Sequence, residues 1–286
     1  MSKLRQKIQR GYEYFLRRIL KIPYTMAVRF DACRARKPEL TIVFLHGIAA
    51  SFTSWRPTVQ ELAKDRDLDK VRFIGLDLIG FGKSPRPEKF SYEYEDYRRV
   101  LTRTIKKLHI KTPIILAGHS MGCLFSMDYA ENGNIDISQL ILVSPPVFRQ
   151  TEVRSLEDRL YNKAYRELNA HTDNGMVDAI ARFVDKISSF EHRSLNTHAF
   201  RETMAKVVLS PRNWQMARNL RTNAVVLHGR VDPLVNGQNL RTINHYNPHF
   251  QLIETFGGHD ITGYKQRRVV TAIKETALKF LLQEAK

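Results

Sequence analysis

The chain has few cysteines and no long apolar run. These two features argue against a disulfide-rich protein and against a membrane-spanning one. Cysteine occurs twice in 286 residues, at Cys33 and Cys123, which is too few for a disulfide framework. No apolar stretch is long enough to span a bilayer, so the sequence predicts no transmembrane helix. Charged residues interrupt the N-terminal stretch, so no secretory signal peptide is predicted either. Together these features predict a cytoplasmic protein.

Metal-ligand spacing is also missing. The two cysteines are far apart, and the ten histidines are scattered along the chain. The pairs His192/His198 and His245/His249 lack a third ligand nearby. We therefore expect neither a metal site nor a bound cofactor.

Acidic residues are scarce relative to basic ones, and the imbalance is uneven. The formal net charge is +17, and residues 1–38 hold eleven Lys and Arg against Glu13 and Asp31. Such a charge attracts anionic membrane surfaces, nucleic acids or acidic substrates. No zinc-finger, RNA-recognition or helix-turn-helix pattern accompanies it, so specific binding of nucleic acid is not predicted.

Residues 1–22 have the pattern of a basic amphipathic helix. Apolar residues recur every three or four positions on one face, and Pro23 ends the pattern. The helix could be a peripheral anchor on the anionic inner surface of a membrane, or it could pack on the protein's own core. The sequence leaves both interpretations open.

The rest of the chain alternates apolar strand-like runs with helix-like segments. This pattern predicts an α/β fold with a mostly parallel central sheet covered by helices on both faces. The expected strands are 26–30, 41–45, 71–76, 114–117, 140–143, 225–227 and 250–255, and the expected helices include 56–64, 92–108, 120–132 and 266–283.

The alternation stops after Ser144-Pro145-Pro146. Residues 147–212 are charged and helix-prone, and they contain no convincing strand. We interpret them as a helical cap inserted into a core formed by residues 23–146 and 213–286.

A short glycine-flanked serine motif carries the strongest functional signal. Gly118-His119-Ser120-Met121-Gly122 lies between an apolar strand and a helix-like stretch. Glycines on both sides allow the sharp turn that exposes a nucleophilic serine hydroxyl. The turn also places the Met121 N–H at a helix start, where it can bind a developing oxyanion. We therefore predict that Ser120 is a nucleophile.

A serine nucleophile requires a base and an acid that orients the base. His259 follows the last strand-like run, in Phe256-Gly257-Gly258-His259-Asp260, and is the predicted base. Asp232 follows the strand before it and is the predicted acid. Asp77 and Asp260 are other carboxylates to consider. The predicted triad is Ser120, Asp232 and His259.

With these motifs in view, residues 25–284 resemble the α/β-hydrolase family, in its capped, esterase- or lipase-like serine hydrolase branch. The run His46-Gly47-Ile48-Ala49-Ala50-Ser51 with Trp55 is similar to the family's oxyanion loop. The resemblance implies that the Ile48 N–H joins the Met121 N–H as a donor. The run Asp77 to Ser84 is similar to a glycine turn of many capped members, for which we expect a structural role. His46 could contact the substrate, but a buried histidine that is hydrogen-bonded to neighbouring loops is an equally good interpretation.

The resemblance implies cleavage of a small-molecule carboxylic ester, with a lipid-like or acylglycerol ester suggested by the N-terminal helix. Serine at position 120 argues against the dehalogenase and epoxide hydrolase branches, which use an aspartate nucleophile. Two alternatives remain open, namely a C–C bond hydrolase or cofactor-free perhydrolase with the same triad, and a noncatalytic ligand-binding or receptor protein on the same fold. The oligomeric state is open as well.

Overall fold

The structure is a computed structural model that describes residues 23–149 and 196–284. The predicted N-terminal helix, and most of the predicted cap, including the apolar positions Val177, Ile180, Ala181 and Val184, lie outside the described residues.

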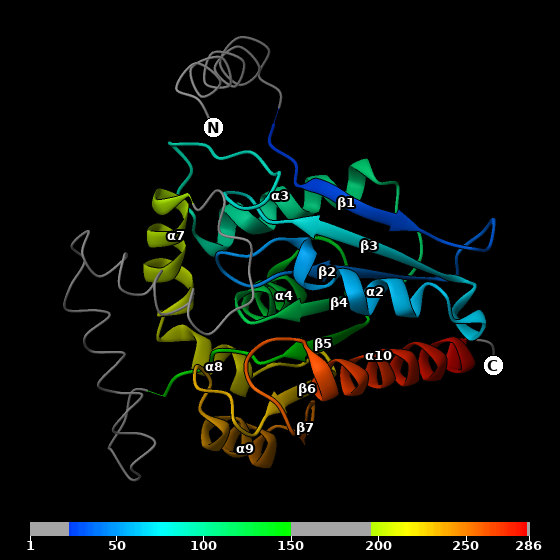
Figure 1. Ribbon diagram of the computed structural model, residues 1–286. Helices are drawn as coiled ribbons and strands as arrows, with labels where there is room; N and C mark the ends of the chain where they lie inside the picture. Colours follow the sequence, from blue (N-terminus) through cyan, green and yellow to red (C-terminus); the bar gives the residue numbers. More distant parts are fainter. Residues whose placement is uncertain (1–22, 150–195, 285–286) are drawn as a thin grey trace.

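A seven-stranded sheet forms the centre of the described chain (Figure 1). Its strand order is β1-β3-β2-β4-β5-β6-β7, and every neighbouring pair is parallel except β1 with β3. The strands are β1 (Ala27–Ala32), β2 (Leu40–Leu45), β3 (Val71–Asp77), β4 (Ile114–His119), β5 (Gln139–Val143), β6 (Ala224–Gly229) and β7 (Phe250–Thr255). The predicted α/β fold and mostly parallel sheet are confirmed.

Helices cover both faces of this sheet, and each face has its own apolar core. The helices are α2 (Arg56–Leu62), α3 (Tyr94–Lys107), α4 (Met121–Asn132), α7 (Thr197–Thr203), α8 (Arg212–Arg218), α9 (Gly237–Tyr246) and α10 (Gly263–Glu284). In Figure 1, α2 and α10 lie in front of the sheet and α3 and α4 lie behind it. One core joins α3, α4 and α9 to the sheet, and the other joins α2 and α10 to it.

Burial on both faces explains the continuous apolar strands. All six residues of β2 are buried, because side chains alternate between two covered faces of a parallel sheet. Helix α10 begins at Gly263, three residues before the start expected from the sequence, and it buries Val269, Ile273 and Ala277 as predicted. Helix α9 was not predicted, and its N-terminus is capped by the Asn236 side chain.

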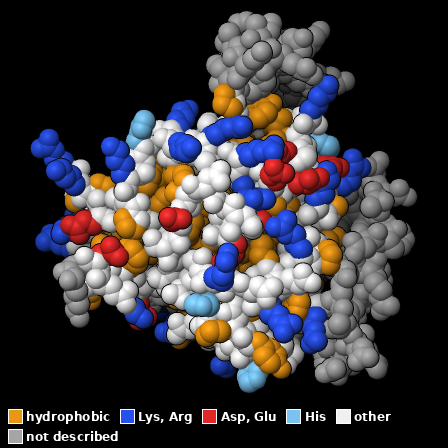
Figure 2. All heavy atoms as spheres, turned by 180° about the vertical axis from the view of Figure 1, so that it is seen from behind, with side chains coloured by type: hydrophobic (Ala, Val, Ile, Leu, Met, Phe, Trp, Pro, Cys, Tyr) orange, Lys and Arg blue, Asp and Glu red, His pale blue; other side chains and the backbone are white. Residues whose placement is uncertain are grey.

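Within the described part of the predicted cap, residues 197–208 are helical. Helix α7 continues into η4 (Met204–Val208), a turn of π-helix. Within the described ranges, no helix has the length and apolar character that crossing a membrane requires. Figure 2 shows Lys and Arg side chains spread over one face, among apolar and uncharged groups and several Asp and Glu side chains. Such a distribution favours long-range attraction of anions over a discrete anion site.

Candidate functional site

The parallel topology brings the predicted site residues to one edge of the sheet. Ser120 follows β4, Asp232 lies three residues after β6, and His259 lies four residues after β7. Because β4, β5, β6 and β7 are parallel neighbours, their carboxyl ends lie side by side. Three residues far apart in the sequence are therefore brought to the same edge.

Ser120 occupies a strained turn between β4 and α4. Its φ is 50° and its ψ is −119°, a backbone conformation that residues other than glycine rarely adopt. The Ser120 N–H donates to the Val143 carbonyl at 2.9 Å, and the Ser120 carbonyl accepts from the Cys123 N–H at 2.9 Å. These bonds fix the turn to β5 and to the first turn of α4. Ser120 as a whole is 8% exposed.

The flanking glycines are required by close backbone packing. A Cβ on Gly122 would lie 2.3 Å from the Leu45 carbonyl oxygen, and one on Gly118 would lie 2.6 Å from the Cys123 nitrogen. Cys123 is buried and its thiol donates to the Gly118 carbonyl at 3.1 Å. Burial raises the pKa of this thiol, so it behaves as the small buried side chain that the sequence predicted.

The predicted oxyanion loop lies against this turn. A Cβ on Gly47 would stand 3.2 Å from the Ser120 Cβ, so the loop that contains Ile48 passes beside the serine. Among the described residues, no loop or turn hydrogen bond takes up the N–H of Ile48 or of Met121. The Trp55 indole donates to the Leu45 carbonyl at 3.0 Å and anchors the far end of the loop. Neither N–H is therefore occupied by a main-chain partner in the described loops and turns.

His46 and Asp77 hold this loop rather than joining the triad. The Leu78 N–H donates to His46 Nε2 at 2.9 Å, so His46 Nδ1 carries the proton and donates to the Gly47 carbonyl at 2.7 Å. Asp77 accepts from the Phe52 N–H at 2.7 Å and pairs with Arg29 at 2.8 Å. Burial lowers the pKa of His46, which favours the neutral ring.

The glycine turn after β3 also has the structural role expected for it. Gly80 has a φ of 90° and Gly82 a φ of 53°, values that suit glycine. A Cβ on Gly82 would lie 2.2 Å from an Asp77 carboxylate oxygen. The Lys83 N–H donates to that oxygen at 2.7 Å. The turn therefore folds around the Asp77 carboxylate.

His259 and Asp232 form a close pair. His259 Nδ1 lies 3.0 Å from each carboxylate oxygen of Asp232, and the Leu234 N–H donates to Oδ1 at 2.9 Å. Burial acts to raise the pKa of Asp232, but the neighbouring His259, Lys265 and Ser144 outweigh it and hold this pKa below its usual value. The carboxylate stays ionised and keeps the proton of the imidazole on Nδ1.

Ser144 and Lys265 complete this cluster, and neither was predicted from the sequence. The Ser144 hydroxyl donates to Asp232 Oδ2 at 2.7 Å, and the Lys265 ammonium donates to the Ser144 hydroxyl at 2.7 Å. These partners are 88 and 121 residues apart in the chain. No local motif signals such contacts. A lysine next to an expected helix start is usually solvated, whereas this one is fully buried.

The serine turn and the base are also linked through His119. His119 Nε2 donates to the His259 carbonyl at 3.0 Å, and the two rings lie 5.1 Å apart. Burial, with His259 and Lys265 nearby, holds the pKa of His119 well below its usual value, so this ring is neutral. Among the described residues, no hydrogen bond joins the Ser120 hydroxyl to His259. Such bonds often tighten only when substrate is bound.

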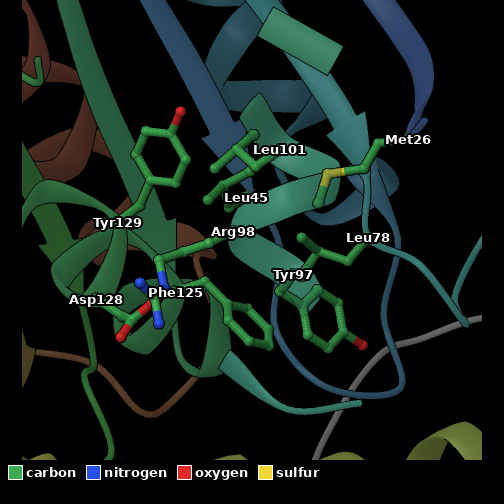
Figure 3. Close-up of a pocket in the computed structure, with 9 residues that line it drawn as sticks. All are labelled: Met26, Leu45, Leu78, Tyr97, Arg98, Leu101, Phe125, Asp128 and Tyr129. Atoms are coloured by element: carbon green, nitrogen blue, oxygen red, sulfur yellow. The ribbon is translucent and has the colours of Figure 1, made fainter. Parts of the chain in front are cut away.

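A small cavity elsewhere in the core is separate from this site. It is lined by the nine residues drawn in Figure 3, Met26, Leu45, Leu78, Tyr97, Arg98, Leu101, Phe125, Asp128 and Tyr129, and none of them is a predicted site residue. Its volume of about 10 Å³ matches a single water molecule. Arg98 and Asp128 form an ion pair at 2.8 Å beside it. In the described part of the chain, no group of three or more His, Cys, Asp or Glu is arranged to hold a metal ion.

Comparisons with known proteins agree with this fold. Residues 41–158 match the alpha/beta hydrolase fold family. BODYGUARD 4 of Arabidopsis thaliana, a probable lysophospholipase, is 30% identical over 128 residues, which cover 45% of this chain and 30% of the plant protein. The chain therefore matches less than a third of that relative's length.

Two further similarities extend over more of the chain. A 2-hydroxy-6-oxo-2,4-heptadienoate hydrolase of Pseudomonas putida is 24% identical over 208 residues, which cover 68% of this chain and 72% of that protein. An esterase of Exiguobacterium antarcticum superposes with a TM-score of 0.68 at 18% identity, covering 89% of this chain and 95% of the esterase. The chain therefore has the alpha/beta hydrolase fold, and its residues 41–158 match the family of that name.

Proposed function

We propose that the protein is a serine hydrolase that cleaves a carboxylic ester through Ser120, Asp232 and His259. The observation that carries this proposal is the pairing of His259 Nδ1 with both Asp232 oxygens, at 3.0 Å each, at the sheet edge where Ser120 occupies its strained turn. A nucleophile, a base and an orienting carboxylate from three separate loops form the arrangement that acyl transfer requires.

In the proposed acylation step, Ser120 Oγ attacks the ester carbonyl carbon while His259 Nε2 takes the hydroxyl proton. The N–H groups of Ile48 and Met121 bind the resulting oxyanion. The C–O bond to the alcohol then breaks, and His259 returns its proton to the departing alkoxide. The product of this half-reaction is an acyl-enzyme at Ser120 and a free alcohol.

Deacylation repeats these steps with water as the nucleophile. His259 takes a proton from the water, the hydroxide attacks the acyl carbon, and the bond to Ser120 breaks. Ser120 Oγ recovers its proton from His259, and the carboxylic acid leaves. Asp232 remains ionised throughout, because Ser144, Leu234 and His259 all donate to it.

A lipid-like ester is the substrate class that we propose. The similarity to a probable lysophospholipase supports it, as does the basic amphipathic pattern of residues 1–22. We further propose that residues 147–212 are a cap over the site and that residues 1–22 contact anionic membrane. Co-sedimentation with anionic vesicles tests that contact, since equal sedimentation of the full chain and of a chain without residues 1–22 would exclude it.

Hydrolysis of a C–C bond is the second candidate. It is favoured by the Pseudomonas putida hydrolase, whose similarity covers more than two thirds of both chains. The same triad and oxyanion donors serve that reaction. A perhydrolase or a noncatalytic binding protein would also retain this arrangement of residues.

Labelling with a fluorophosphonate followed by a substrate panel tests the proposal. We expect the intact mass of the wild-type protein to increase by one phosphonyl group and that of Ser120→Ala to stay unchanged. We then expect turnover of esters in preference to ring-fission products. Turnover of ring-fission products alone would favour the second candidate, whereas absence of labelling and turnover would favour a binding protein.

A further inference from the structure

Lys265 is a charged residue with a fully buried side chain, in the first turn of α10. It is 0% exposed and is among the largest fully buried side chains of the described residues. An ammonium group without hydrogen-bond partners would be strongly destabilising at such a position. The environment of this group must therefore compensate for its charge.

The three hydrogens of the ammonium have three acceptors, and all three are in the acid-base part of the site. Lys265 Nζ donates to the Ser144 hydroxyl at 2.7 Å, to the Gly258 carbonyl at 2.7 Å and to the His259 carbonyl at 2.8 Å. An ammonium has three donors and no acceptor, so its capacity is fully used. The contacts are therefore specific to this place rather than incidental.

The contact with Ser144 has a defined direction. Because lysine can only donate, the Ser144 oxygen accepts from Lys265 and its single hydrogen is directed to Asp232 Oδ2. Ser144 is itself held in position, since its φ is 52° and its N–H donates to the Leu227 carbonyl at 2.8 Å. The ammonium thereby acts on the carboxylate through a fixed hydroxyl.

The contact with His259 acts on the other partner of the pair. The His259 carbonyl accepts from Lys265 at 2.8 Å and from His119 Nε2 at 3.0 Å. Together with the Gly258 contact, these bonds fix the backbone from which the imidazole extends. The loop is rich in glycine, and Gly257 has a φ of 142°, so the loop has little rigidity of its own.

The charged groups around Lys265 are mixed in sign. Asp232 and Asp260 favour its protonated form, while burial lowers the pKa of Lys265 to about 8. Cys123, His119 and His228 also face this group, and burial keeps the thiol and both imidazoles predominantly neutral. At neutral pH the ammonium is therefore charged and compensates the Asp232 carboxylate.

We propose that Lys265 is a positioning residue that holds Asp232, through Ser144, and His259, through its backbone carbonyl, in the geometry that activates Ser120. This role rests on the proposed function. In the described part of the chain, Lys265 makes no hydrogen bond to Ser120 and, in the proposed mechanism, does not contact the substrate.

The test is the second-order rate constant of fluorophosphonate labelling at Ser120, measured against pH for the full chain and for Lys265→Met. Methionine retains most of the apolar stem and removes the three donors. We expect labelling to slow by about tenfold or more, which corresponds to about 1.4 kcal/mol or more in the barrier, because Asp232 and His259 lose the contacts that hold them in place. We also expect the acid limb of the rate profile to move to higher pH, because the uncompensated Asp232 favours imidazolium.

Lys274→Met is the matched control. Lys274 lies on the same helix and pairs with Asp65 at 2.6 Å and Asp67 at 2.7 Å, away from the candidate site. This variant should have the wild-type rate and the wild-type pH profile. A profile that moves equally in both variants would overturn the proposal.

Ser144→Ala keeps the proposal testable if Lys265→Met does not fold, as judged by thermal unfolding. It breaks the link to Asp232 and leaves both carbonyl contacts of Lys265, so we expect labelling to slow severalfold. If either variant folds and has the wild-type rate and pH profile, the positioning role of Lys265 is overturned, whereas the proposed function is not. An unlabelled wild-type protein would overturn the proposed function and this role with it.

Discussion

The candidate site has two sides that are held in place in different ways. The serine side comprises residues 46–55 and 118–123. The acid-base side comprises Ser144, Asp232, Lys265 and residues 257–260. The turn of the serine side depends on close main-chain packing at Gly118 and Gly122. The acid-base side depends on the connected polar contacts of Lys265, Ser144, Asp232 and His259. The serine turn is therefore sensitive to a Cβ at either glycine, and the acid-base side is sensitive to the loss of a polar group.

The largest effect is expected when the acid-base side loses its imidazole. His259→Ala should lower the hydrolysis rate of a p-nitrophenyl ester by about 10⁴-fold or more, as loss of the base does in other serine hydrolases with this triad. The variant should still unfold cooperatively, because His259 extends from a loop at the edge of the sheet and belongs to neither apolar core. Steady-state kinetics and thermal unfolding measure both. Wild-type turnover by the variant would contradict the assignment of the base.

A glycine-to-alanine substitution should lower the free energy of unfolding more on the serine side than on the acid-base side. Gly122→Ala places a Cβ 2.3 Å from the Leu45 carbonyl oxygen, and we expect it to lower the free energy of unfolding by about 3 kcal/mol or more. At Gly258 a Cβ meets nothing nearer than the Val231 oxygen at 4.0 Å, so Gly258→Ala should change stability by less than about 1 kcal/mol. Urea unfolding of the two variants makes the comparison. Equal losses would show that the two sides do not differ in this respect.

A smaller effect follows from the buried charge of the acid-base side. The pKa of Lys265 is lowered to about 8 in the folded state, against 10.5 for an ordinary lysine. Below pH 8 both states bind the proton, and the cost of burying the charge is fully present. Between about pH 8 and 10.5 the unfolded state binds the proton that the folded state has lost, so this group makes stability rise with pH.

The wild-type protein should therefore gain stability relative to Lys265→Met over that interval, by up to about 3 kcal/mol. Urea unfolding of both proteins at several pH values measures the gain. Lys274→Met is again the control and should follow the wild-type protein. A constant difference between wild-type and Lys265→Met across the interval would contradict the lowered pKa.

The comparison of the two sides also explains what the sequence could predict. The alternation of strands and helices and the turn at Ser120 depend on nearby residues, so the fold, the sheet and the serine turn could be inferred from local patterns. The positions of Asp232 and His259 followed from the strands that precede them. Ser144 and Lys265 could not be found in this way, because their roles depend on partners that approach only after the sheet has formed.

Two further differences have the same physical origin. Helix α9 begins at Gly237 in a polar stretch. Its N-cap is Asn236, and asparagine is equally common in turns. Helix α10 begins at Gly263, with a φ of 56°, before the amphipathic pattern becomes regular. In both cases the helix starts where the apolar pattern is not yet regular, so the pattern alone does not locate its first residue.

The central claim is that Ser120 is acylated during turnover, and trapping the acyl-enzyme tests it most directly. The protein would be mixed with a p-nitrophenyl ester, quenched with acid within the first turnover and digested, and the peptides would be sequenced by tandem mass spectrometry. The account predicts one acyl group on Ser120, and none on that peptide in the Ser120→Ala variant. Ester turnover with no acyl group on Ser120, or with the acyl group on another residue, would contradict it.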